Sequence, residues 1–393
     1  MASNDGHGAE IVVIGGGIAG VSAGYALGRH TSGPTITVIE AEGQLAHHTT
    51  GRSAALFIEN YGTGPTRALT KASRLYFHHP PPELVDGPLL ETRGVLSVAR
   101  PDQERYFQQA LAEGRAVNPD IAEITIEDAV DLFPPLRADR LSRALYEPGA
   151  SDIDVGRLHQ SFVRGIVAMG GTISTSTRAR SLSRTGGRWT ITTSAGDLRA
   201  DLVVDAAGAW GDDVAQRAGI EPLGLTPLRR TAFMVARPES LPARAPLTAE
   251  IEHEDWYVKP DGAQILCSPA DETPSEPCDA RPEEIDIARA IDLINEATTL
   301  GITSIRSSWA GLRTFSPDRT MVIGPEPGEP AFIWCVGQGG TGIQTAPAAG
   351  QLVADLTLDG EPSAVFDAAA TGLELDVDAI TPGRFRRVGP SAR

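Results

Sequence analysis

Three glycines and one glutamate near the start of the chain have the types and spacing needed to hold two linked phosphates and a ribose. Gly15, Gly17 and Gly20 form a Gly-x-Gly-x-x-Gly motif, and Glu40 follows twenty residues after the last glycine. Gly15 allows a tight turn, Gly17 lets the backbone approach a pyrophosphate, and Gly20 lets a helix pack against a strand. A carboxylate at Glu40 can accept hydrogen bonds from both ribose hydroxyls. The motif predicts an adenine dinucleotide site, with a purely structural glycine turn as the alternative.

These residues need a strand, a helix and a second strand to position them. The apolar run Ile-Val-Val-Ile at 11–14 predicts a buried parallel strand, 19–29 predicts a helix, and Ile-Thr-Val-Ile at 36–39 predicts the second strand. The helix then points its unpaired N–H groups and its positive dipole end at the phosphates. A nicotinamide enzyme would continue with another strand-helix unit, but the residues at 41–55 are small and polar. This departure disfavours a simple nicotinamide dehydrogenase.

Composition limits the class of protein. A chain of 393 residues with 41% hydrophobic and 22% charged residues is typical of a globular protein with two domains. A net charge of −17 opposes binding to nucleic acid or to an anionic membrane. The first residues show no signal-peptide pattern, and no apolar run approaches the ~18 residues of a membrane span. We therefore expect a cytoplasmic protein without a membrane span.

Cysteine and histidine spacing argues against a metal site. Cys267, Cys278 and Cys335 lie far apart without a Cys-x-x-Cys motif, so three free thiols are expected. The histidine pairs His47/His48 and His78/His79 do not have the spacing of known ligand motifs. We predict no metal.

The remaining chain alternates helical and strand patterns. Asp154 is predicted to cap a helix at 155–169, and residues 172–195 have the period-two pattern of a hairpin or meander. Other predicted helices are 66–77, 103–117, 126–133 and 282–300, and predicted strands include 94–100, 231–237, 245–251, 255–260 and 263–269. Strands dominate between residues 222 and 269, which predicts an antiparallel sheet.

Several separated motifs resemble, in order, the D-amino acid oxidase superfamily of flavoenzymes. They are GGGIAG with Glu40, HTTGRSAALFIENYG, DAAGAW, WYVKP, WAGLRTFSPD and VGQGGTGIQT. Within the superfamily, GRSAA and the Arg229/Arg230 pair are most similar to the bacterial FAD-dependent D-arginine dehydrogenase group, with a glycine oxidase-like group beside it.

The resemblance implies an α/β fold. A Rossmann-like FAD-binding domain of the glutathione-reductase type is interleaved with an α+β substrate domain that has a mainly antiparallel sheet. We assign residues 9–85, 150–222 and 310–372 to the FAD domain and residues 86–149 and 223–309 to the substrate domain. Residues 373–393 are assigned to a C-terminal extension.

The resemblance also implies which residues bind FAD. These are Gly15, Gly17, Ile18, Ala19, Gly20, Glu40, Ala41, His48, Thr50, Gly51, Arg52, Ser53, Ala54, Ala207, Gly208, Trp210, Gly311, Arg313, Gly339, Gly340, Thr341, Gly342, Ile343 and Gln344. We expect noncovalent FAD, with a covalent link through His47 or His48 as the alternative. The helix after the second glycine cluster is expected to begin near Thr341, since Pro347 is tolerated only in a first turn.

An amino acid substrate presents a carboxylate, which a guanidinium supported by a hydroxyl can bind. Arg313 and Tyr257 match those family positions, with a structural ion pair and a core tyrosine as the plain alternatives. With the carboxylate held, a hydride leaves Cα for flavin N5, and the imine hydrolyses to a 2-oxo acid and ammonia. Water held by Tyr61 or Tyr257 can accept the ammonium proton. Gln344 and Arg230 also match pocket positions, although Arg230 can instead be a surface arginine.

Three departures concern substrate choice. Val95 stands where the D-arginine group has a glutamate, Leu56 where it has a histidine, and Ile58 where it has a threonine. Burying a cation against these side chains costs several kcal/mol unless an acid compensates, for which Glu59, Glu250 and Glu252 are candidates. The three residues can also be plain core. Without a compensating acid, an apolar or modified side chain is expected.

The first prediction for function is oxidation of an α-amino acid, with the D enantiomer preferred. The alternative is a secondary-amine or N-substituted glycine oxidase that cleaves a different C–N bond. A 2-hydroxy acid oxidase and a flavin-binding protein without catalysis rank lower. The expected partners are a small amine or amino acid and an electron acceptor, oxygen or another. Neither the acceptor nor the oligomeric state can be read from the sequence.

Overall fold

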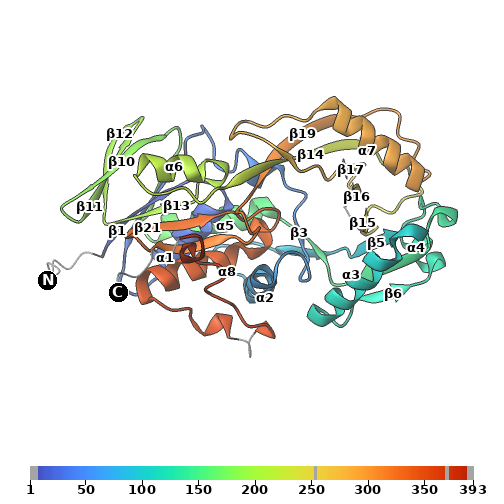
Figure 1. Ribbon diagram of the computed structural model, residues 1–393, viewed down its shortest axis with the longest axis horizontal. Coiled ribbons are helices and arrows are strands. Elements are labelled where there is room, and N and C mark those ends of the chain that lie inside the picture. The colour runs from blue at the N-terminus through green and yellow to red at the C-terminus, as the bar shows by residue number, and fades with distance from the viewer. Residues whose placement is uncertain (1–7, 252–254, 368–370, 387–393) are drawn as a thin grey trace, which may run out of the picture.

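The computed structural model describes residues 8–251, 255–367 and 371–386. A six-stranded sheet lies towards one end of an elongated molecule and a nine-stranded sheet towards the other (Figure 1). None of the described helices is long and apolar enough to cross a membrane. The boundaries between the two domains remain our own division of the chain.

The six-stranded sheet carries the glycine motif at its centre. Its order is β20-β21-β13-β1-β2-β9, and all neighbours are parallel except β20 and β21. The strands are β1 (Glu10–Ile14), β2 (Thr35–Ile39), β9 (Thr172–Ser174), β13 (Leu202–Asp205), β20 (Val322–Glu326) and β21 (Glu329–Val336). The two strands predicted around the glycine motif are confirmed.

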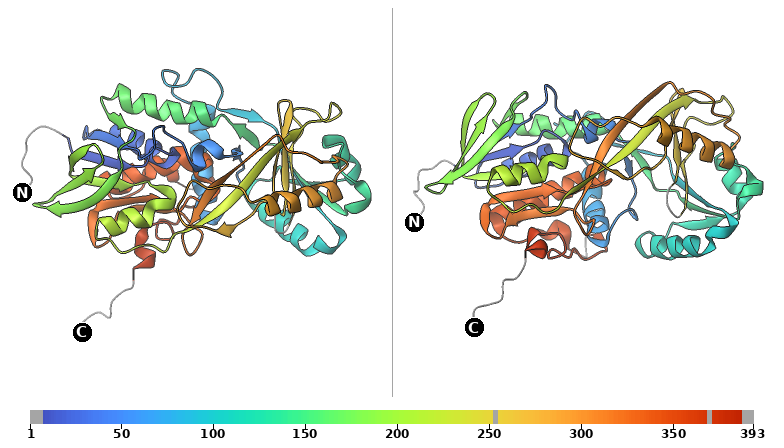
Figure 2. Two further views of the ribbon diagram at one scale, coloured as in Figure 1. Left: turned by 90° about the horizontal axis from the view of Figure 1, so that it is seen from above. Right: turned by 45° about the horizontal axis from the view of Figure 1, so that its top comes forward.

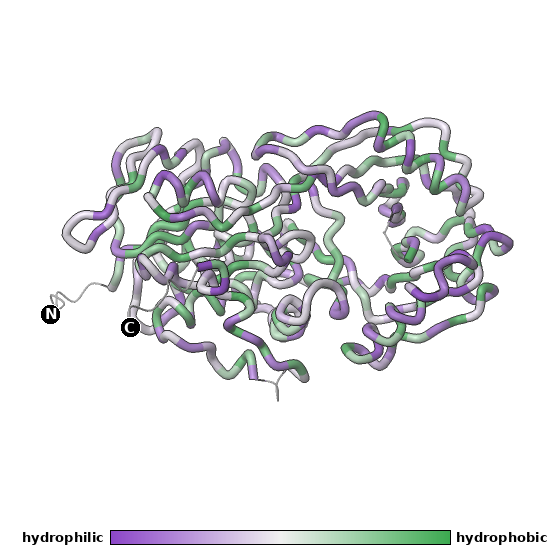
Figure 3. The backbone as a smooth tube through the Cα atoms, viewed as in Figure 1, coloured by the Kyte–Doolittle hydropathy of each residue, from purple (hydrophilic) through white to green (hydrophobic). Residues whose placement is uncertain are grey.

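Both faces of this sheet are covered, as the continuous apolar run of β1 requires. Ile11 and Val13 belong to one core, which includes side chains of α1, α5 and α8, whereas Val12 and Ile14 belong to a second core. Hydrophobic residues accordingly follow the central strands in Figure 3. The covering elements are α1 (Ile18–Gly28), α2 (Gly64–His78), α5 (Val155–Ala168) and α8 (Gly342–Ala354), with α6 (Gly211–Arg217) and a meander of β10 (Ala179–Thr185), β11 (Arg188–Thr193) and β12 (Gly196–Ala200) opposite.

The nine-stranded sheet is mainly antiparallel, as predicted. Its order is β18-β14-β17-β16-β15-β5-β7-β6, with β19 also paired to β14, and only β5 and β15 are parallel. The strands are β5 (Val95–Ala99), β6 (Ala122–Ile124), β7 (Arg143–Glu147), β14 (Thr226–Ala236), β15 (Leu247–Glu250), β16 (Tyr257–Asp261), β17 (Gln264–Ser268), β18 (Thr273–Pro274) and β19 (Ser307–Phe315). Three helices pack on it, α3 (Glu104–Val117), α4 (Ile126–Leu132) and α7 (Glu284–Ala297), as the two further views show (Figure 2).

A small sheet is formed by segments of the chain that connect strands of one large sheet to strands of the other. Its order is β3-β8-β4, formed by β3 (Leu56–Phe57), β4 (Leu90–Thr92) and β8 (Ser151–Ile153). Lys259 on β16 joins it to the nine-stranded sheet, because its Nζ donates to the carbonyl oxygen of Ala54 at 2.8 Å and contacts Asp152 Oδ1 at 3.1 Å. This connection fixes the segment that precedes Leu56.

Two local expectations need correction. Residues 172–174 do not belong to the predicted meander but pair with β2 in the six-stranded sheet, because the period-two pattern cannot tell which sheet a strand joins. The helix after the second glycine cluster does begin next to Thr341, its N-cap, but Pro347 lies inside it rather than in its first turn. The predicted cap of α5 is confirmed, since Asp154 Oδ1 accepts a hydrogen bond from the backbone N–H of Arg157 at 2.8 Å.

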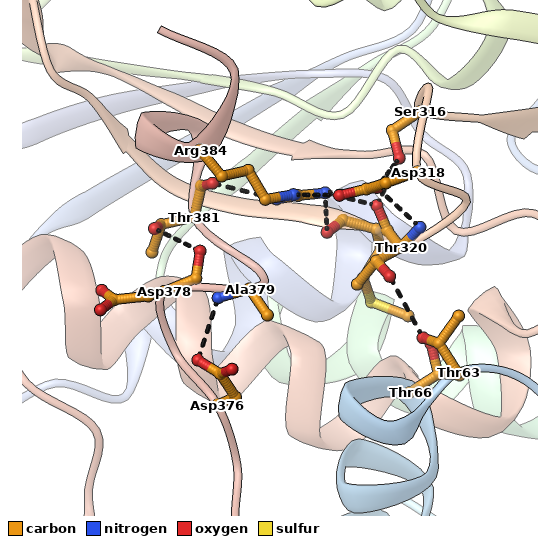
Figure 4. Close-up of polar contacts among 11 residues, drawn as sticks. Thr63, Thr66, Ser316, Asp318, Thr320, Asp376, Asp378, Ala379, Thr381 and Arg384 are labelled. Carbon is orange, nitrogen blue, oxygen red and sulfur yellow. Dashed lines mark hydrogen bonds and ion pairs between the residues drawn. The ribbon is translucent and has the colours of Figure 1, made fainter. Parts of the chain in front are cut away.

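The C-terminal segment is docked against the turn after β19. Arg384 Nε donates to Asp318 Oδ2 at 2.7 Å, and its Nη2 donates to the carbonyl oxygen of Thr320 at 2.6 Å (Figure 4). Thr320 Oγ1 in turn donates to Thr63 Oγ1 at 3.3 Å, at the start of α2. Ile380 is fully buried, so this segment is an integral part of the structure.

Candidate active site

The glycine loop between β1 and α1 has the geometry of a phosphate-binding turn. Gly15 has a φ of 118°, which only glycine adopts readily. A Cβ at Gly20 would lie 1.8 Å from the carbonyl oxygen of Gly15, whereas a Cβ at Gly17 would meet only Thr50 Oγ1, at 3.3 Å. Gly20 therefore permits close packing of the helix, and Gly17 leaves its open side towards a cavity.

Glu40 is fixed beside this loop. Its Oε2 accepts a hydrogen bond from the backbone N–H of Gly16 at 2.7 Å, and its Oε1 accepts one from that of Glu42 at 2.8 Å. Each carboxylate oxygen retains a second acceptor position. The side chain lines the cavity, where it can accept from ribose hydroxyls.

Two buried groups outside the predicted set fix backbone near this cavity, one in the glycine loop and one in the turn after β13. His159 on α5 is 3% exposed, and its Nε2 donates to the carbonyl oxygen of Gly16 at 3.0 Å; burial lowers the pKa of this imidazole. Asp205, at the end of β13, accepts from the backbone N–H of Ala207 at 3.1 Å. Neither could be found from sequence, because both depend on which residues of distant elements pack against the loop.

Asp205 provides a test of stability against pH. Its side chain is fully buried and its Oδ2 has no hydrogen-bond partner in the described structure, and burial raises the pKa of this carboxyl well above its ordinary value. The folded protein therefore holds a proton that the unfolded chain releases above about pH 4, so stability falls as pH rises. We expect Asp205→Asn to stabilise the protein at pH ~7 by on the order of 1 kcal/mol. Urea unfolding at several pH values measures this, and an equal gain near pH ~4 would contradict it.

Three adjoining cavities run from the glycine loop to the nine-stranded sheet. The glycine-loop cavity, beside Gly15 and Glu40, has a volume of about 150 Å³. The central cavity, beside Gly17 and Gly340, has about 140 Å³, and the outer cavity, beside Leu56 and Val95, has about 330 Å³. The central cavity shares lining residues with each of the other two.

Most predicted site residues line these cavities. The glycine-loop cavity contacts Gly15, Gly17, Glu40, Ala41, His48, Thr50, Arg52, Ala207, Gly208, Trp210 and Gly311. The central cavity contacts Gly17, Ile18, Ala19, Thr50, Arg52, Ser53, Ala54, Gly208, Arg230, Tyr257, Gly311, Arg313, Gly339, Gly340, Gly342 and Ile343. The outer cavity contacts Ser53, Ala54, Leu56, Ile58, Tyr61, Val95, Tyr257, Arg313, Gly340, Ile343 and Gln344. Gly20, Gly51 and Thr341 line none of the three but shape the turns beside them.

Arg313 and Tyr257 stand where the central and outer cavities meet. Arg313, on β19, donates from Nη1 to the hydroxyl of Tyr61 at 3.3 Å. A Cβ at Gly340 would lie 2.9 Å from Arg313 Cζ, so a larger residue there would displace the guanidinium from this position. The junction thus combines a cation with two tyrosine side chains, a suitable set for a carboxylate.

Gln344 binds the backbone of the segment that carries Tyr61. Its Oε1 accepts from the N–H of Ile58 at 3.1 Å, and its Nε2 donates to the carbonyl oxygen of Ile58 at 3.2 Å and to Thr70 Oγ1 at 3.0 Å. These contacts use both N–H donors of the amide and one of the two acceptor positions of its oxygen. Gln344 therefore positions the cavity wall.

Arg230 is largely buried rather than solvated. Its side chain is 9% exposed, and Nη2 forms an ion pair with Glu272 Oε1 at 3.2 Å. Glu272 also pairs with Arg319, at 2.9 Å. Arg230 lines the central cavity from the opposite strand of the β14–β19 pair, where it adds positive charge.

The acids proposed for the outer cavity already have partners. Glu59 accepts from Arg74 Nε at 2.5 Å, and Glu250 pairs with Arg100 and accepts from Gln103 Nε2 at 3.2 Å. Glu252 lies outside the described residues. Glu250 lines the outer cavity, and so does a further acid that was not predicted, Glu147.

His47 and His48 line the glycine-loop cavity and neither of the other two cavities. His48 Nε2 lies 3.3 Å from Glu42 Oε1, and its ring centroid lies 4.7 Å from that of Trp210. With Glu42, the two histidines place ligand atoms within 4.8 Å of one another, the arrangement closest to a metal site in the described part of the chain. The absence of a metal stays a prediction.

Cys267 and Cys335 are buried free thiols and Cys278 is an exposed one, as expected.

Known proteins share both the sequence and the fold. Glycine oxidase from Pseudomonas aeruginosa is 27% identical over 366 residues, 90% of this chain and 96% of that protein. Human mitochondrial dimethylglycine dehydrogenase is 25% identical over 388 residues, which span 90% of this chain but 43% of that protein.

Among solved structures, L-proline dehydrogenase from P. horikoshii matches with a TM-score of 0.82 at 21% identity, covering 96% of this chain and 98% of that one. Iminodiacetate oxidase from Chelativorans sp. BNC1 matches with a TM-score of 0.74 at 22% identity, covering 93% of this chain and 99% of that one. These likenesses confirm the predicted fold class.

The model of the FAD dependent oxidoreductase (DAO) family matches residues 10–356. This range includes the glycine loop, Glu40 and both residues at the cavity junction. The chain therefore belongs to the DAO family of FAD-dependent oxidoreductases, as the order of its motifs predicted.

Proposed function

We propose that the protein oxidises the C–N bond of an α-amino acid, with the D enantiomer as the expected substrate. The observation that carries this proposal is the position of Arg313, Tyr61 and Tyr257 where the central and outer cavities meet. A guanidinium and neighbouring hydroxyl groups can donate hydrogen bonds to both oxygens of a carboxylate. Such binding fixes the orientation of the carboxylate and therefore the position of the α-carbon next to it.

The cavities fit FAD. The open side of Gly17, the Glu40 carboxylate fixed by backbone N–H groups and the N-terminus of α1 suit a ribose and phosphates at one end. The glycines at 339, 340 and 342 line the central cavity, where we place the flat flavin ring at the other end. When bound there, FAD supplies the acceptor for two electrons and a proton equivalent, taken together as a hydride.

The protein's own residues orient the substrate. Arg313 holds the substrate carboxylate, and the ordered segment at Ile58, fixed by Gln344, keeps Tyr61 against the guanidinium. The substrate amine must lose its proton before the hydride leaves, and water held by Tyr257 or Tyr61 accepts that proton. The product imine then hydrolyses to a 2-oxo acid and ammonia. Positioning accounts for most of this catalysis.

A second candidate is oxidation of an N-substituted glycine, which the same carboxylate site accommodates. The relatives named dimethylglycine dehydrogenase and iminodiacetate oxidase favour it. Anaerobic titration of the purified yellow holoenzyme with D- and L-amino acids, glycine and N-substituted glycines separates the two, since bleaching of flavin absorbance identifies the substrate. Readmission of air then tests oxygen as acceptor. If no amine bleaches the flavin, both candidates fail.

We expect FAD to be held without a covalent bond. His47 and His48 lie beside Glu40 in the glycine-loop cavity, away from the cavity at Gly340 where we place the flavin ring. Acid precipitation of the holoenzyme should leave all the flavin in the supernatant and a colourless pellet. Flavin fluorescence that stays with the denatured chain would contradict this expectation, and variants of each histidine would then locate the link.

A further inference from the structure

Glu147 projects into the outer cavity from the end of β7. It is the cross-strand partner of Val95 on β5, and partners in an antiparallel pair place their side chains on the same face of a sheet. Both residues line the cavity, together with Ser97, Leu145 and Ala249 of the same sheet. An acid therefore faces the cavity from β7. The D-arginine group has its acid on the neighbouring strand, at the position of Val95 on β5.

Glu147 is buried, with 5% of the residue exposed. Burial, together with the negative charge of Glu59, raises the pKa of Glu147 to about 7, whereas hydrogen bonds from the Asn118 side chain and the Glu59 backbone lower it. None of these neighbours in the described structure is a cation. The nearby acids differ, because Glu59 pairs with Arg74 and Glu250 with Arg100.

Such a carboxylate is costly to keep ionised inside a cavity unless a cation pairs with it. Arg313 stands at the junction with the central cavity and holds Tyr61. Between these groups the walls are largely apolar, with Leu56, Ile58 and Val95 among them. The outer cavity therefore offers a cation for a carboxylate, an apolar wall for an aliphatic chain and, for a second basic group, an acid that has no cationic partner among the described residues.

We propose that Glu147 determines substrate specificity by binding a second basic nitrogen, at the far end of an amino acid whose carboxylate is held by Arg313. This inference rests on the proposed function and names its substrate class. It also assigns the compensating acid that a basic substrate needs against Leu56, Ile58 and Val95. Glu147 acts in binding, and the oxidised C–N bond is still the one at the α-carbon.

The first test compares matched substrates in the holoenzyme. D-Lysine and D-norleucine share an aliphatic chain and differ in the terminal ammonium. We expect wild type to prefer D-lysine in kcat/KM by at least about tenfold, and Glu147→Gln to reduce that preference about 10–100-fold, mainly through KM. Glu147→Asp should restore part of it. Glu123→Gln serves as the control, because Glu123 is an exposed acid on β6 of the same sheet, and it should leave the preference unchanged.

The pH profile adds a readout that a structural role would not change. Glu147 must be ionised to pair with an ammonium, so the D-lysine to D-norleucine preference should rise as pH increases through about 7 in wild type. The ratio cancels deprotonation of the α-amine, which both substrates share. In Glu147→Gln the ratio should not vary with pH. A ratio that is flat in wild type, or unchanged by the substitution, overturns the inference.

Ligand binding separates this inference from the proposed function. 6-Aminohexanoate and hexanoate carry the carboxylate and chain but no α-amine, so they cannot be oxidised there. Perturbation of the flavin spectrum should show 6-aminohexanoate binding at least about tenfold more tightly, a preference lost in Glu147→Gln. Equal binding overturns the role of Glu147 even if amino acids are oxidised. If 6-aminohexanoate binds more tightly as expected but no amine is oxidised, only the proposed function is refuted.

Discussion

Replacing Arg313 with methionine is expected to lower kcat/KM for the amine substrate by on the order of 10²–10³-fold while the protein retains its FAD. The guanidinium lies at the junction of the central and outer cavities and donates to Tyr61. Methionine has a similar length but cannot donate to a carboxylate, so the substrate loses both binding energy and orientation. Steady-state kinetics with the bleaching substrate, together with the flavin content of the purified variant, measure the two effects separately.

The matched control is Arg199→Met on β12, an exposed arginine remote from the three cavities. It removes the same charge and should leave kcat/KM unchanged. Arg313→Lys should recover only part of the activity, since an ammonium cannot bind a carboxylate through two parallel hydrogen bonds. An Arg313→Met enzyme with undiminished kcat/KM would remove the basis of the proposed function.

Gly20→Ala is expected to abolish stable FAD binding. The added Cβ would lie 1.8 Å from the carbonyl oxygen of Gly15, and this obstacle is backbone, which cannot turn aside as the end of a side chain can. Either α1 moves away from β1 or the glycine loop distorts, and each change displaces the N–H groups that bind phosphate. We expect colourless or insoluble protein, measured as the ratio of flavin to protein absorbance and by thermal unfolding.

Gly149→Ala is a suitable comparison. A Cβ there meets open space, and its backbone is not in the left-handed region, so flavin content should equal that of wild type. A fully yellow Gly20→Ala protein with unchanged thermal stability would show that the close contact between α1 and the loop is not required.

The sequence predicted the parts of the site that depend on local patterns. The glycine loop, Glu40 and the cap at Asp154 follow from short-range rules on turns and helix ends, and each is found where it was expected. The reason given for the start of α8 was wrong, because Pro347 is accommodated inside the helix. The predicted start of the helix near Thr341 was right, but the argument from Pro347 that led to it was not.

Residues that depend on strand register could not be predicted. Glu147 faces the outer cavity only because β7 pairs with β5 so that it lies opposite Val95, and a shift of one residue would turn it away. Glu250 was a candidate in the sequence for the acid that binds a basic substrate, but its carboxylate forms an ion pair with Arg100. Likewise, the contact of His159 with Gly16 joins residues far apart in the chain.

The strand order of the six-stranded sheet has a consequence for how the protein is made. β1 is completed by residue 14, but its neighbour β13 begins at residue 202 and the next strand, β21, ends at residue 336. At about 5–20 residues per second, the ribosome needs on the order of tens of seconds to supply these partners. Until β13 has been synthesised, the apolar strand at Ile11–Ile14 has an unpaired edge, so nascent chains are exposed to aggregation during synthesis. Slower translation or scarce chaperones should therefore reduce the yield of folded enzyme more than its final stability would suggest.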